Sequence, residues 1–481
     1  MSGSRPGASQ GLTPPSIATR HRSPADETAC QRRAVQAVVV LALVVSLAYL
    51  VWRTLFTLGP LWISVPLLLL EVHAVVSLAL FAFSLWDLHG SPDPEKWQPP
   101  PDRHRVAILI TTYDEPEEVL LPTVAAAVAL DEPHRTLVLD DGNRGWVNDL
   151  CQRLGAQHVT RRDNSHAKAG NLNHAIEMLR DSIDIVAVLD ADHVPSEGFL
   201  AQTLPYFADP AVALVQTPQE FYNTESFEHT TSRSLFWPSQ RGARHHEQAV
   251  FYRAVQSGKN RWNASFWCGT NALLRVEALR SVGGVAVDSI TEDILTTVRM
   301  HRRGWRTVYH NEVLAHGLAA RTLDEYQLQR FRWGSGAMQV LRRERPLTGP
   351  GLTLGQRLSY ATSLLGWFDA WRTFGFLCWP MLSLVSGQLP IEGNVVTFAV
   401  LYVTTSVLQR LAGSMLARGM ASTGFAMVFD IIRMPVNLRA TLTIRPTAGA
   451  RSWSHRARRR SRRCPRWAAG PIPARASAST G

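Results

Sequence analysis

The sequence predicts an α/β domain, a mostly parallel sheet with helices on both faces, embedded between α-helical transmembrane segments. Three observations support this prediction. Short apolar runs alternate with helix-like segments over residues 102–345, as in parallel sheets whose strands are connected by helices. Long apolar runs with few charges lie before and after this region. The net charge of +11 comes largely from the two ends of the chain, where basic residues beside a membrane explain it better than nucleic-acid binding does.

The cysteines predict neither a disulfide framework nor a zinc site. They are odd in number, widely separated and without a Cys-x-x-Cys pair, whereas both kinds of site need cysteines at suitable spacings. A reducing compartment therefore fits the soluble part of the chain. The five residues are Cys30, Cys151, Cys268, Cys378 and Cys464.

The N-terminal region is predicted to be a basic tail followed by two membrane crossings. Residues 1–33 are rich in Ser, Pro, Gly and Arg, which indicates a disordered tail. Within residues 34–88, the runs Ala34–Trp52 and Pro60–Trp86 are each long enough to cross a bilayer as a helix. The arginines before the first run place the N-terminus in the cytoplasm, and two crossings return the chain to that side.

Two ionisable residues interrupt the second apolar run. Glu71 and His73 either pack inside a helix bundle or line a polar channel, because ionisable groups at membrane depth are costly and face a partner or a cavity. The sequence leaves both interpretations open.

The soluble domain over residues 102–345 is predicted from its alternating strands and helices. In an open sheet of this kind, ligands bind beyond the carboxyl ends of the strands. Polar residues that follow the strands are therefore the first candidates for a site. The expected strands are Val106–Ile110, Thr136–Leu139, Ile185–Leu189 and Ala211–Gln216, and the expected helices include Pro116–Leu130, Ala167–Leu179 and Ile294–His301.

The strand Ile185–Leu189 ends in Asp190-Ala-Asp192-His193 and is the centre of the predicted site. Residues i and i+2 leave an extended strand on the same side, so the carboxylates of Asp190 and Asp192 can converge just beyond the strand. Two carboxylates suit Mg²⁺ or Mn²⁺, and Mg²⁺ is usually held by one or two carboxylates together with substrate phosphates. His193 either adds a ligand or flanks the site. Taken alone, an Asp-x-Asp pair is also typical of a solvated turn.

Two neighbouring strand ends carry groups suited to a nucleotide. The turn after the first strand contains Thr112, Tyr113 and Glu115, whose backbone and side chains could hold a base and a ribose. The turn after the second strand contains Asp140 and Asp141, which can accept from a uracil N–H or a ribose hydroxyl. Taken singly, each of these turns is also a common loop.

Lys168 opens a predicted helix within the run His166-Ala-Lys168-Ala-Gly170-Asn171. A cationic group at a helix N-terminus suits a diphosphate. The run is not a P-loop, because the pattern GxxxxGK[ST] is absent.

Three later motifs have both a structural and a functional interpretation. The turn Phe266–Thr270, which contains Cys268, is either core packing or a wall of an acceptor site. Asp293, in Thr291-Glu292-Asp293, is either an acid in the first turn of a helix or a general base that takes a proton from an attacking hydroxyl. The run Gln329-Arg-Phe-Arg332-Trp333 is either a solvated basic helix face or a site where Arg332 steadies a pyrophosphate and Trp333 offers an apolar face to a sugar.

The C-terminal region is predicted to return to the membrane and then to end in a tail. An amphipathic interfacial helix starts near Leu352, and an even number of crossings leaves the C-terminus in the cytoplasm. Seven of the thirteen residues 451–463 are arginine, which attracts the tail to anionic lipid. The predicted segments are 350–434 for the membrane region, with crossings at Phe374–Leu389 and Val395–Leu411 and a short interfacial segment at Gly424–Ile432, and 435–481 for the Arg-rich disordered tail.

Taken together, these motifs resemble those of processive family 2 glycosyltransferases. The run His166–Asn171 and the turn Phe266–Gly269 are most similar to bacterial cellulose synthase catalytic subunits. The resemblance covers residues 105–345 and, in layout, the flanking membrane helices. The motifs found in the order of that family are Asp140-Asp141-Gly142, Asp190-x-Asp192, Thr291-Glu292-Asp293 and Gln329-x-x-Arg332-Trp333.

The resemblance implies a GT-A catalytic domain that uses a UDP-sugar, inverts the anomeric centre and makes a β-linked polymer, β-1,4-glucan from UDP-glucose being the leading expectation. It assigns Mg²⁺ (or Mn²⁺) to Asp190, Asp192 and His193, and the catalytic base to Asp293. It assigns UDP-sugar binding to Thr112, Tyr113, Glu115, Asp140, Asp141 and Lys168, and acceptor binding to Cys268, Glu292, Gln329, Arg332 and Trp333.

The resemblance also implies a location and partners. The expectation is a multi-pass protein of the inner (plasma) membrane with a cytoplasmic catalytic domain, and its partners are a UDP-sugar donor, a growing polysaccharide, the lipid bilayer and accessory export subunits, but no nucleic acid. Two alternatives stay open. One is the same chemistry with another sugar or linkage, as in β-1,3-glucan, mannan or an N-acetylglucosamine polymer. The other is a non-catalytic scaffold of a polysaccharide-export complex.

The C-terminal end departs from the family pattern. Cellulose synthases usually carry further helices, a gating loop and a cyclic-di-GMP-binding PilZ barrel, whereas an arginine-rich tail follows the fourth predicted crossing here. This departure predicts either a shorter relative without that regulation or a C-terminus changed by truncation or a frame-shift.

Overall fold

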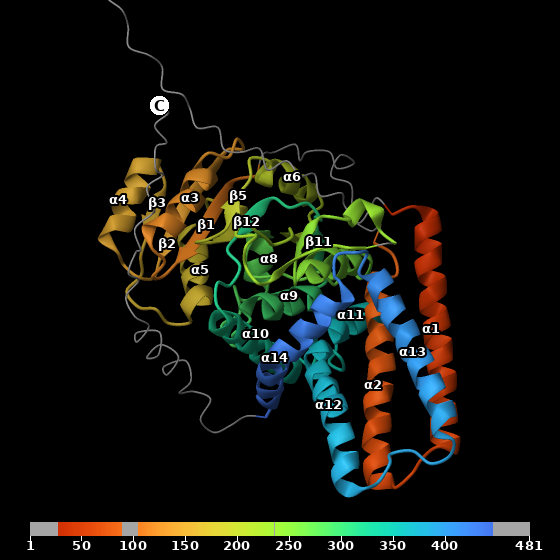
Figure 1. The fold of residues 1–481 in the computed structure, drawn as a ribbon. Coiled ribbons are helices and arrows are strands. Elements are labelled where there is room, and N and C mark those ends of the chain that lie inside the picture. Colours follow the sequence, from red (N-terminus) through yellow and green to blue (C-terminus); the bar gives the residue numbers. More distant parts are fainter. Residues whose placement is uncertain (1–26, 89–103, 235, 446–481) are drawn as a thin grey trace, which may run out of the picture.

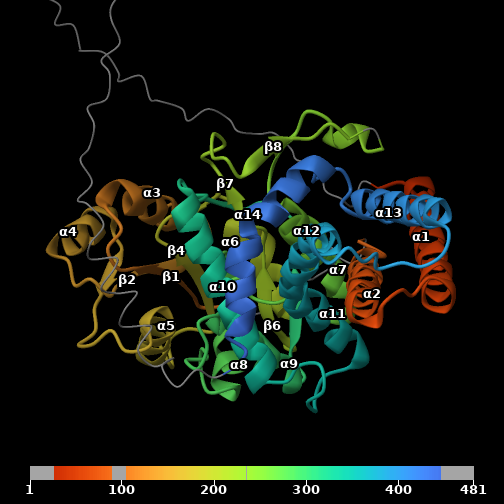
Figure 2. The same ribbon diagram turned by 60° about the horizontal axis from the view of Figure 1, so that its bottom comes forward.

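The computed structural model describes residues 27–88, 104–234 and 236–445. Within these ranges a sheet domain lies at one end, and long helices extend away from it (Figure 1). A layer of helices, among them α10 and α14, lies between the two (Figure 2). The sheet domain and the long helices therefore form separate parts of one molecule, and the helical layer joins them.

The main sheet has seven strands in the order β11-β6-β10-β4-β1-β2-β3. Strand β10 runs antiparallel to both of its neighbours, and all the other pairs in this sheet are parallel. The predicted fold class, a mostly parallel sheet with helices on both faces, is confirmed. The strands are β1 Val106–Thr112, β2 His134–Asp140, β3 Gln157–Val159, β4 Ile185–Asp190, β6 Val212–Gln216, β10 Ala272–Arg275 and β11 Arg306–Tyr309.

The central strands are buried on both faces, which explains why they read as continuous apolar runs. In β1, Ile108 and Ile110 join one core cluster, whereas Ala107 and Leu109 join another, as the two-residue period of a strand requires. Helices α3 (Glu117–Val128), α4 (Gly145–Leu154) and α6 (Phe199–Thr203) contribute to the first cluster, and α5 (Ala167–Met178) and α8 (Val276–Ser281) contribute to the second.

Short strands extend the domain beyond the main sheet. A three-stranded sheet has the order β5-β12-β7, and β8 and β9 form an antiparallel hairpin. These strands are β5 Val194–Pro195, β7 Glu220–Phe221, β8 His229–Thr231, β9 Arg244–His246 and β12 Ala315–Gly317, and the short helix α7 spans Gln256–Gly258.

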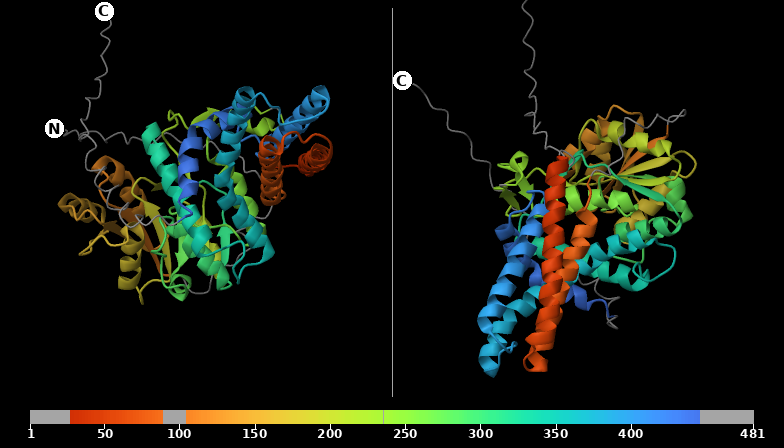
Figure 3. Two further views of the ribbon diagram at one scale, coloured as in Figure 1. Left: turned by 90° about the horizontal axis from the view of Figure 1, so that it is seen from below. Right: turned by 90° about the vertical axis from the view of Figure 1, so that its right-hand side faces the viewer.

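Three of the described helices are long and apolar enough to cross a membrane: α1 (Ala29–Phe56), α2 (Leu61–Leu85) and α13 (Val395–Leu416). They correspond to the first, second and fourth predicted crossings. Helix α1 packs against α13 and α2, and α2 also packs against α12 (Asp369–Ser386). Many of the large apolar side chains on these helices are exposed, and the helices run in one direction away from the sheet domain (Figure 3).

Helix α12 corresponds to the predicted third crossing, Phe374–Leu389, but it differs in extent. It begins at Asp369 and continues through Pro380 without a break. Because Asp369 and Arg372 lie in its first turn, its apolar part is short, and it is not among the three helices above. Its neighbour α11 spans Leu354–Leu365, where the interfacial helix was predicted.

Two predicted domain boundaries are wrong. Helix α1 begins at Ala29, so residues 29–33 are helical rather than part of a tail, because the Thr28 hydroxyl accepts a hydrogen bond from the Gln31 N–H at 3.2 Å and caps the helix. Helix α14 spans Thr423–Leu442, so the predicted short segment 424–432 is part of a longer helix and the tail predicted from residue 435 begins inside it. The rest of both predicted tails, 1–26 and 446–481, lies outside the described residues.

The length of α14 follows from its packing against α10 (Leu323–Arg343). Gly334 of α10 allows a close approach, since a Cβ atom there would lie 2.7 Å from the Cβ of Ala440. Together with α9 (Glu292–Arg302), these helices lie beside the sheet (Figure 2). Tertiary contact therefore stabilises a helix that its sequence pattern alone did not indicate.

Glu71 and His73 face different neighbours. The Glu71 carboxylate accepts a hydrogen bond from Tyr49 at 3.1 Å and lies 3.6 Å from Nε of the fully buried Arg53. His73 Nδ1 lies 3.7 Å from the carboxylate of Asp369 on α12. Both residues thus lie in contacts between helices, which is the first of the two interpretations that the sequence left open.

Candidate active site at the strand ends

The end of β4 brings together three residues that could bind a metal ion. Asp190 is the last residue of β4, and Asp192 and His193 follow it. One possible ligand atom from each residue lies within 4.8 Å of the other two. The side chains of Asp190 and Asp192 are 37 % and 30 % exposed, whereas that of His193 is 6 % exposed. The carboxylates are thus accessible beside a buried imidazole.

The His193 ring is held from two sides. Its Nδ1 lies 2.8 Å from Oδ1 of Asp192, and a Cβ atom at Gly317 would lie 2.5 Å from the ring. Its buried Nε2 has no hydrogen-bond partner among the described residues. Burial alone would lower the pKa of His193, but the Asp192 carboxylate outweighs this effect and raises it. Two accessible carboxylates with one imidazole are a donor set that fits Mg²⁺ or Mn²⁺.

Lys168 connects this cluster to the loop before β10. It is the second residue of α5, and its ammonium group donates to Asp190 and to the carbonyl oxygen of Gly269, the latter at 2.8 Å. Burial would lower the pKa of Lys168, but the carboxylates of Asp190 and Glu292 outweigh it and raise the pKa. Lys168 is therefore a fixed cation next to the candidate metal ligands.

The two carboxylates of the turn after β2 are paired with arginines. Asp140 is 1 % exposed and accepts from the N–H groups of Gly142 and Arg144 at 2.9 and 2.7 Å and from Nε of Arg144 at 3.0 Å. Asp141 accepts two hydrogen bonds from the Arg161 guanidinium, at 2.6 and 2.7 Å. The Asp140 carboxylate is thus hydrogen-bonded within its own turn, and the Asp141 side chain is 8 % exposed beside Arg161.

Sequence reasoning missed both arginines. Arg144 follows Asp140 by four residues, a separation at which local ion pairs are common, so the sequence contained an indication of this pair. Arg161 is twenty residues from Asp141, and no local pattern connects them. Only the arrangement of β2 beside β3 brings the second pair together.

The turn after β1 is organised by Glu115. Its Oε2 accepts from the Thr112 hydroxyl at 2.6 Å and from the Tyr113 N–H at 2.8 Å. Thr112 also accepts from Arg144 at 2.7 Å, which joins this turn to the turn after β2. The Tyr113 side chain is 47 % exposed. Of these three predicted site residues, Tyr113 is therefore the one whose side chain is free to face a ligand.

Asp293 lies in the first turn of α9, close to Lys168. A Cβ atom at Gly269, whose φ is +85°, would lie 3.4 Å from Oδ2 of Asp293 and 3.8 Å from Nζ of Lys168, so Gly269 separates the two groups. Burial and the charge of Glu292 raise the pKa of Asp293 to about 7. Burial also raises the pKa of Glu292, against the opposing charges of Lys168 and Arg332. A carboxylate with a pKa near neutrality suits general-base catalysis.

Cys268 is fixed by two glutamines that sequence reasoning missed. Gln256 Nε2 donates to the Cys268 sulfur at 3.0 Å and to the Phe266 carbonyl at 2.9 Å. Gln219 Nε2 donates to the Cys268 carbonyl at 2.9 Å. Burial and the nearby Asp293 raise the pKa of the thiol, so it stays protonated. The turn Phe266–Thr270 thus packs into the core and also places Cys268 and Gly269 beside Asp293.

The predicted acceptor residues of α10 lie along one helix. Gln329 and Trp333 are half-buried, and Arg332 is exposed. The guanidinium of Arg330, the residue after Gln329, lies 4.8 Å from the centre of the Trp333 ring. Helix α10 approaches the N-terminal turn of α9, since a Cβ atom at Gly336 would lie 2.8 Å from the Cβ of Thr291, the residue that caps α9.

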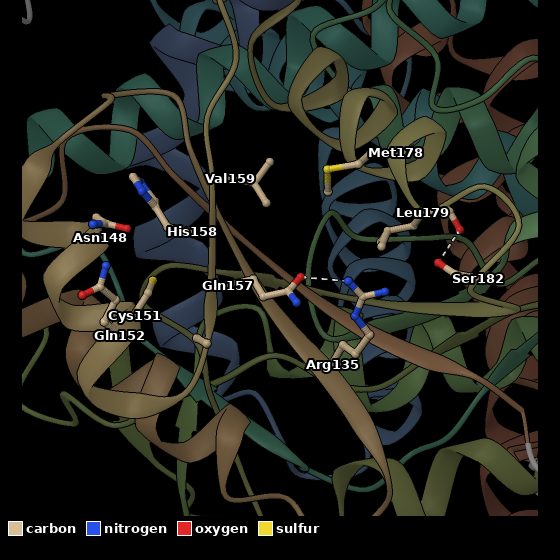
Figure 4. Close-up of a pocket in the computed structure, with 11 residues that line it drawn as sticks. Arg135, Asn148, Cys151, Gln152, Gln157, His158, Val159, Met178, Leu179 and Ser182 are labelled. Carbon is tan, nitrogen blue, oxygen red and sulfur yellow. Dashed lines mark hydrogen bonds between the residues drawn. The ribbon is translucent and has the colours of Figure 1, made fainter.

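A cavity of about 440 Å³ lies at the sheet edge around β3, away from these residues (Figure 4). It is lined by residues of α4, β3 and the end of α5, and none of the predicted site residues is among them. In Figure 4, Arg135 and Gln157 are joined by a hydrogen bond of 2.9 Å. One of its lining residues, His158, reaches the turn after β2, since its Nε2 lies 3.3 Å from Oδ2 of Asp140.

Two known protein families match overlapping parts of this chain. The family described as "Glycosyltransferase like family 2" matches residues 101–336, and the family described as "Cellulose synthase" matches residues 276–419. The two matches overlap, and together they include every predicted site residue.

Curated relatives give the same result over part of their length. The cellulose synthase catalytic subunit [UDP-forming] of Pseudomonas fluorescens (strain SBW25) is 37% identical over 371 residues, which are 74% of this chain and 48% of that protein. The subunit of the same name from Xanthomonas axonopodis pv. citri (strain 306) is 39% identical over 341 residues, 68% of this chain and 45% of that protein. The chain thus spans about half the length of the curated relatives it matches.

A solved structure shares the fold. The mannosyltransferase PcManGT from Pyrobaculum calidifontis, in complex with GDP-Man and Mn²⁺, has a TM-score of 0.52 at 17% sequence identity. The alignment covers 77% of this chain and 98% of that one.

Proposed function

We propose, because this chain belongs to the family 2 glycosyltransferases, that it transfers a sugar from a UDP-sugar to the end of a growing β-linked polysaccharide. One observation carries the proposal. The residues expected to bind a metal ion and a diphosphate and to act as base converge around Gly269, at the end of β4 and the starts of α5 and α9. They are Asp190, Asp192, His193, Lys168 and Asp293.

The donor would bind across the strand ends. Asp190, Asp192 and His193 would hold Mg²⁺ or Mn²⁺, which when bound supplies charge neutralisation for the diphosphate of the donor. Lys168 places a second positive charge at the same point. The exposed ring of Tyr113 is available to the base or the ribose. Thr112, Glu115 and Asp140 would act indirectly, by holding the two turns in shape, and Asp141 would contact the donor beside Arg161.

The acceptor would approach from the side of Asp293. Its carboxylate, with a pKa of about 7, is suited to take the proton from an acceptor hydroxyl as that oxygen attacks the anomeric carbon. The bond from that carbon to the UDP oxygen breaks on the opposite side, and the configuration inverts. Lys168 and Arg332 then face the charge that develops on the departing UDP. Cys268, Glu292, Gln329 and Trp333 would form the wall against which the acceptor sugar lies.

The membrane helices fit the same proposal. Helices α1, α2 and α13 are long and apolar enough to span a bilayer, and their exposed apolar side chains need lipid. We propose that the chain crosses the inner (plasma) membrane several times and that residues 102–345 lie in the cytoplasm. The polymer would be passed outward beside the helices, with accessory export subunits as partners.

The test is UDP release from membranes that contain the chain, with a panel of UDP-sugars, Mg²⁺ or Mn²⁺, and the Asp293→Asn variant beside the wild type. The expected result is release with one sugar, which is lost with EDTA and lowered about a hundredfold in the variant. The panel also separates UDP-glucose from the UDP-sugar donor of an N-acetylglucosamine polymer. If folded wild-type protein releases no UDP with any sugar, the transferase proposal fails and a scaffold role replaces it.

A further inference from the structure

A buried carboxylate outside the predicted site joins three separate elements. Glu247 follows β9, and its side chain is 5 % exposed. Its Oε1 accepts from the Tyr326 hydroxyl at 2.9 Å and from the Arg330 guanidinium, both on α10. Its Oε2 lies 3.6 Å from Nη1 of Arg433 on α14. Its backbone N–H donates to the carbonyl of Glu228 at 2.8 Å, so the chain around Glu247 is fixed as well.

The Arg330 side chain lies between Glu247 and Trp333, which is a predicted acceptor-binding residue. Its guanidinium lies 4.7 Å from the centre of the Tyr326 ring and 4.8 Å from that of Trp333. Arg330 is 7 % exposed, and its Nε has no hydrogen-bond partner among the described residues. Glu247 accepts the hydrogen bond of this buried cation, whereas the second carboxylate, that of Glu228, lies 3.9 Å away. Loss of Glu247 would therefore free Arg330 to turn toward Glu228 and leave the face of Trp333.

Helix α14 contributes the second arginine. Arg433 pairs with Glu247 and with Asp430, and its side chain is 33 % exposed. Burial would raise the pKa of Glu247, but Arg330 and Arg433 outweigh it and lower the pKa. The Glu247 carboxylate is therefore negative in the folded protein and holds a cation on each side.

We infer that Glu247 is a positioning residue for acceptor binding, which acts through Arg330 on Trp333. Arg433 links the packing of α14 against α10 to the same three side chains. This inference rests on the proposed function, because Trp333 is taken as an acceptor-binding residue. It adds to that function a link between the C-terminal helix and the acceptor. In the described structure, α14 bound to α10 completes the two-arginine pairing of Glu247.

The test measures acceptor binding apart from donor turnover. The full chain, in detergent or nanodiscs, is titrated with cellohexaose, and amide hydrogen exchange is followed in the segment 326–340. The expected result for the wild type is protection around Trp333, which Trp333→Ala removes. Glu247→Gln weakens the affinity for cellohexaose about tenfold and Arg433→Gln about threefold, because small misplacements of a binding group cost this much. The KM for the UDP-sugar changes less than about twofold in both variants, since neither residue faces the donor.

Glu344 supplies the matched control. Glu344 is the residue that caps the C-terminus of α10, and its carboxylate also lies between two arginines, Arg299 and Arg302. Glu344→Gln is expected to lower the melting temperature without changing the affinity for cellohexaose. Arg433→Gln keeps the test decisive if Glu247→Gln folds poorly, because Arg433 is partly exposed.

Two results would overturn the inference. One is a wild type that gains no protection from cellohexaose. The other is an affinity in Glu247→Gln and Arg433→Gln equal to that of the wild type or of Glu344→Gln. A different result would be no UDP release from a wild type that still shows these cellohexaose effects. That result would contradict the proposed transfer reaction but not the positioning role of Glu247.

Discussion

The turns after β2 and β4 both end a buried strand in aspartates, but the structure uses these residues in opposite ways. Asp140 and Asp141 are paired with Arg144 and Arg161 and are nearly buried. Asp190 and Asp192 are accessible, share a small volume with His193 and face one lysine. The acidic residues look equivalent in the sequence. Their cationic partners decide which pair stabilises a turn and which is free to bind a cation.

The difference has a physical reason. An arginine bound to a carboxylate through two hydrogen bonds satisfies most of its lone pairs, so such a carboxylate has little capacity left for an ion. The lysine beside Asp190 donates to one oxygen only, and the imidazole beside Asp192 is itself a possible ligand. The carboxylates of the turn after β4 can therefore still bind a cation, whereas those of the turn after β2 are already bound to arginines.

The largest expected effect comes from removing a carboxylate of the β4 turn. Asp192→Asn should lower UDP release by about a thousandfold, because the charge stabilisation that a metal supplies is worth several kcal/mol. The melting temperature should change little. Asp184→Asn is the matched control, since Asp184 precedes the same strand and forms an exposed pair with Arg105. Its turnover should stay within about twofold of the wild type, and an equal loss in both variants would contradict the comparison.

A change in the β2 turn should act on stability instead. Asp140→Asn leaves Arg144 and its backbone N–H groups without a buried carboxylate, which should cost about 3 kcal/mol of unfolding free energy. Denaturant unfolding measures this cost, and turnover per folded molecule should fall far less than in Asp192→Asn. The reverse pattern, a stable protein that has lost donor binding, would show that Asp140 contacts the nucleotide.

Asp293 extends the comparison to a carboxylate without an arginine. Its pKa of about 7 is raised, so the base is protonated and inactive below this value and free to accept a proton above it. The rate of UDP release should fall about tenfold for each pH unit below 7. Asp293→Asn should lower the rate by about a hundredfold and remove this limb of the profile. A limb of unchanged position in the variant would assign the titration to another group.

The smallest effect is expected for Arg161→Lys. A lysine keeps the charge beside Asp141 but loses the paired geometry of the guanidinium, so the cost should be about 1 kcal/mol in unfolding free energy. The KM for the UDP-sugar serves as the second measurement. Because Asp141 is proposed to contact the donor beside Arg161, the KM should rise in this variant, and an unchanged KM would remove the pair from the donor site.

Much of this arrangement was predictable because it is local. The apolar runs of β1 and β4 and the i, i+2 spacing of Asp190 and Asp192 depend on neighbouring residues only. The pairing of Asp141 with Arg161 and that of Glu247 with Arg330 and Arg433 were not predictable, since these partners are distant in the sequence. The full length of α14 also depends on a distant surface, that of α10.

The binding place of a divalent cation distinguishes the two turns most directly. Mn²⁺ titrated into the purified chain with UDP, and followed by electron paramagnetic resonance, measures this without turnover. We expect bound Mn²⁺ in the wild type and in Asp140→Asn and Asp141→Asn at temperatures where these variants are folded, and none in Asp192→Asn. Bound Mn²⁺ in Asp192→Asn, or its loss in folded Asp141→Asn alone, would show that the ion binds elsewhere and would contradict the distinction between the two turns.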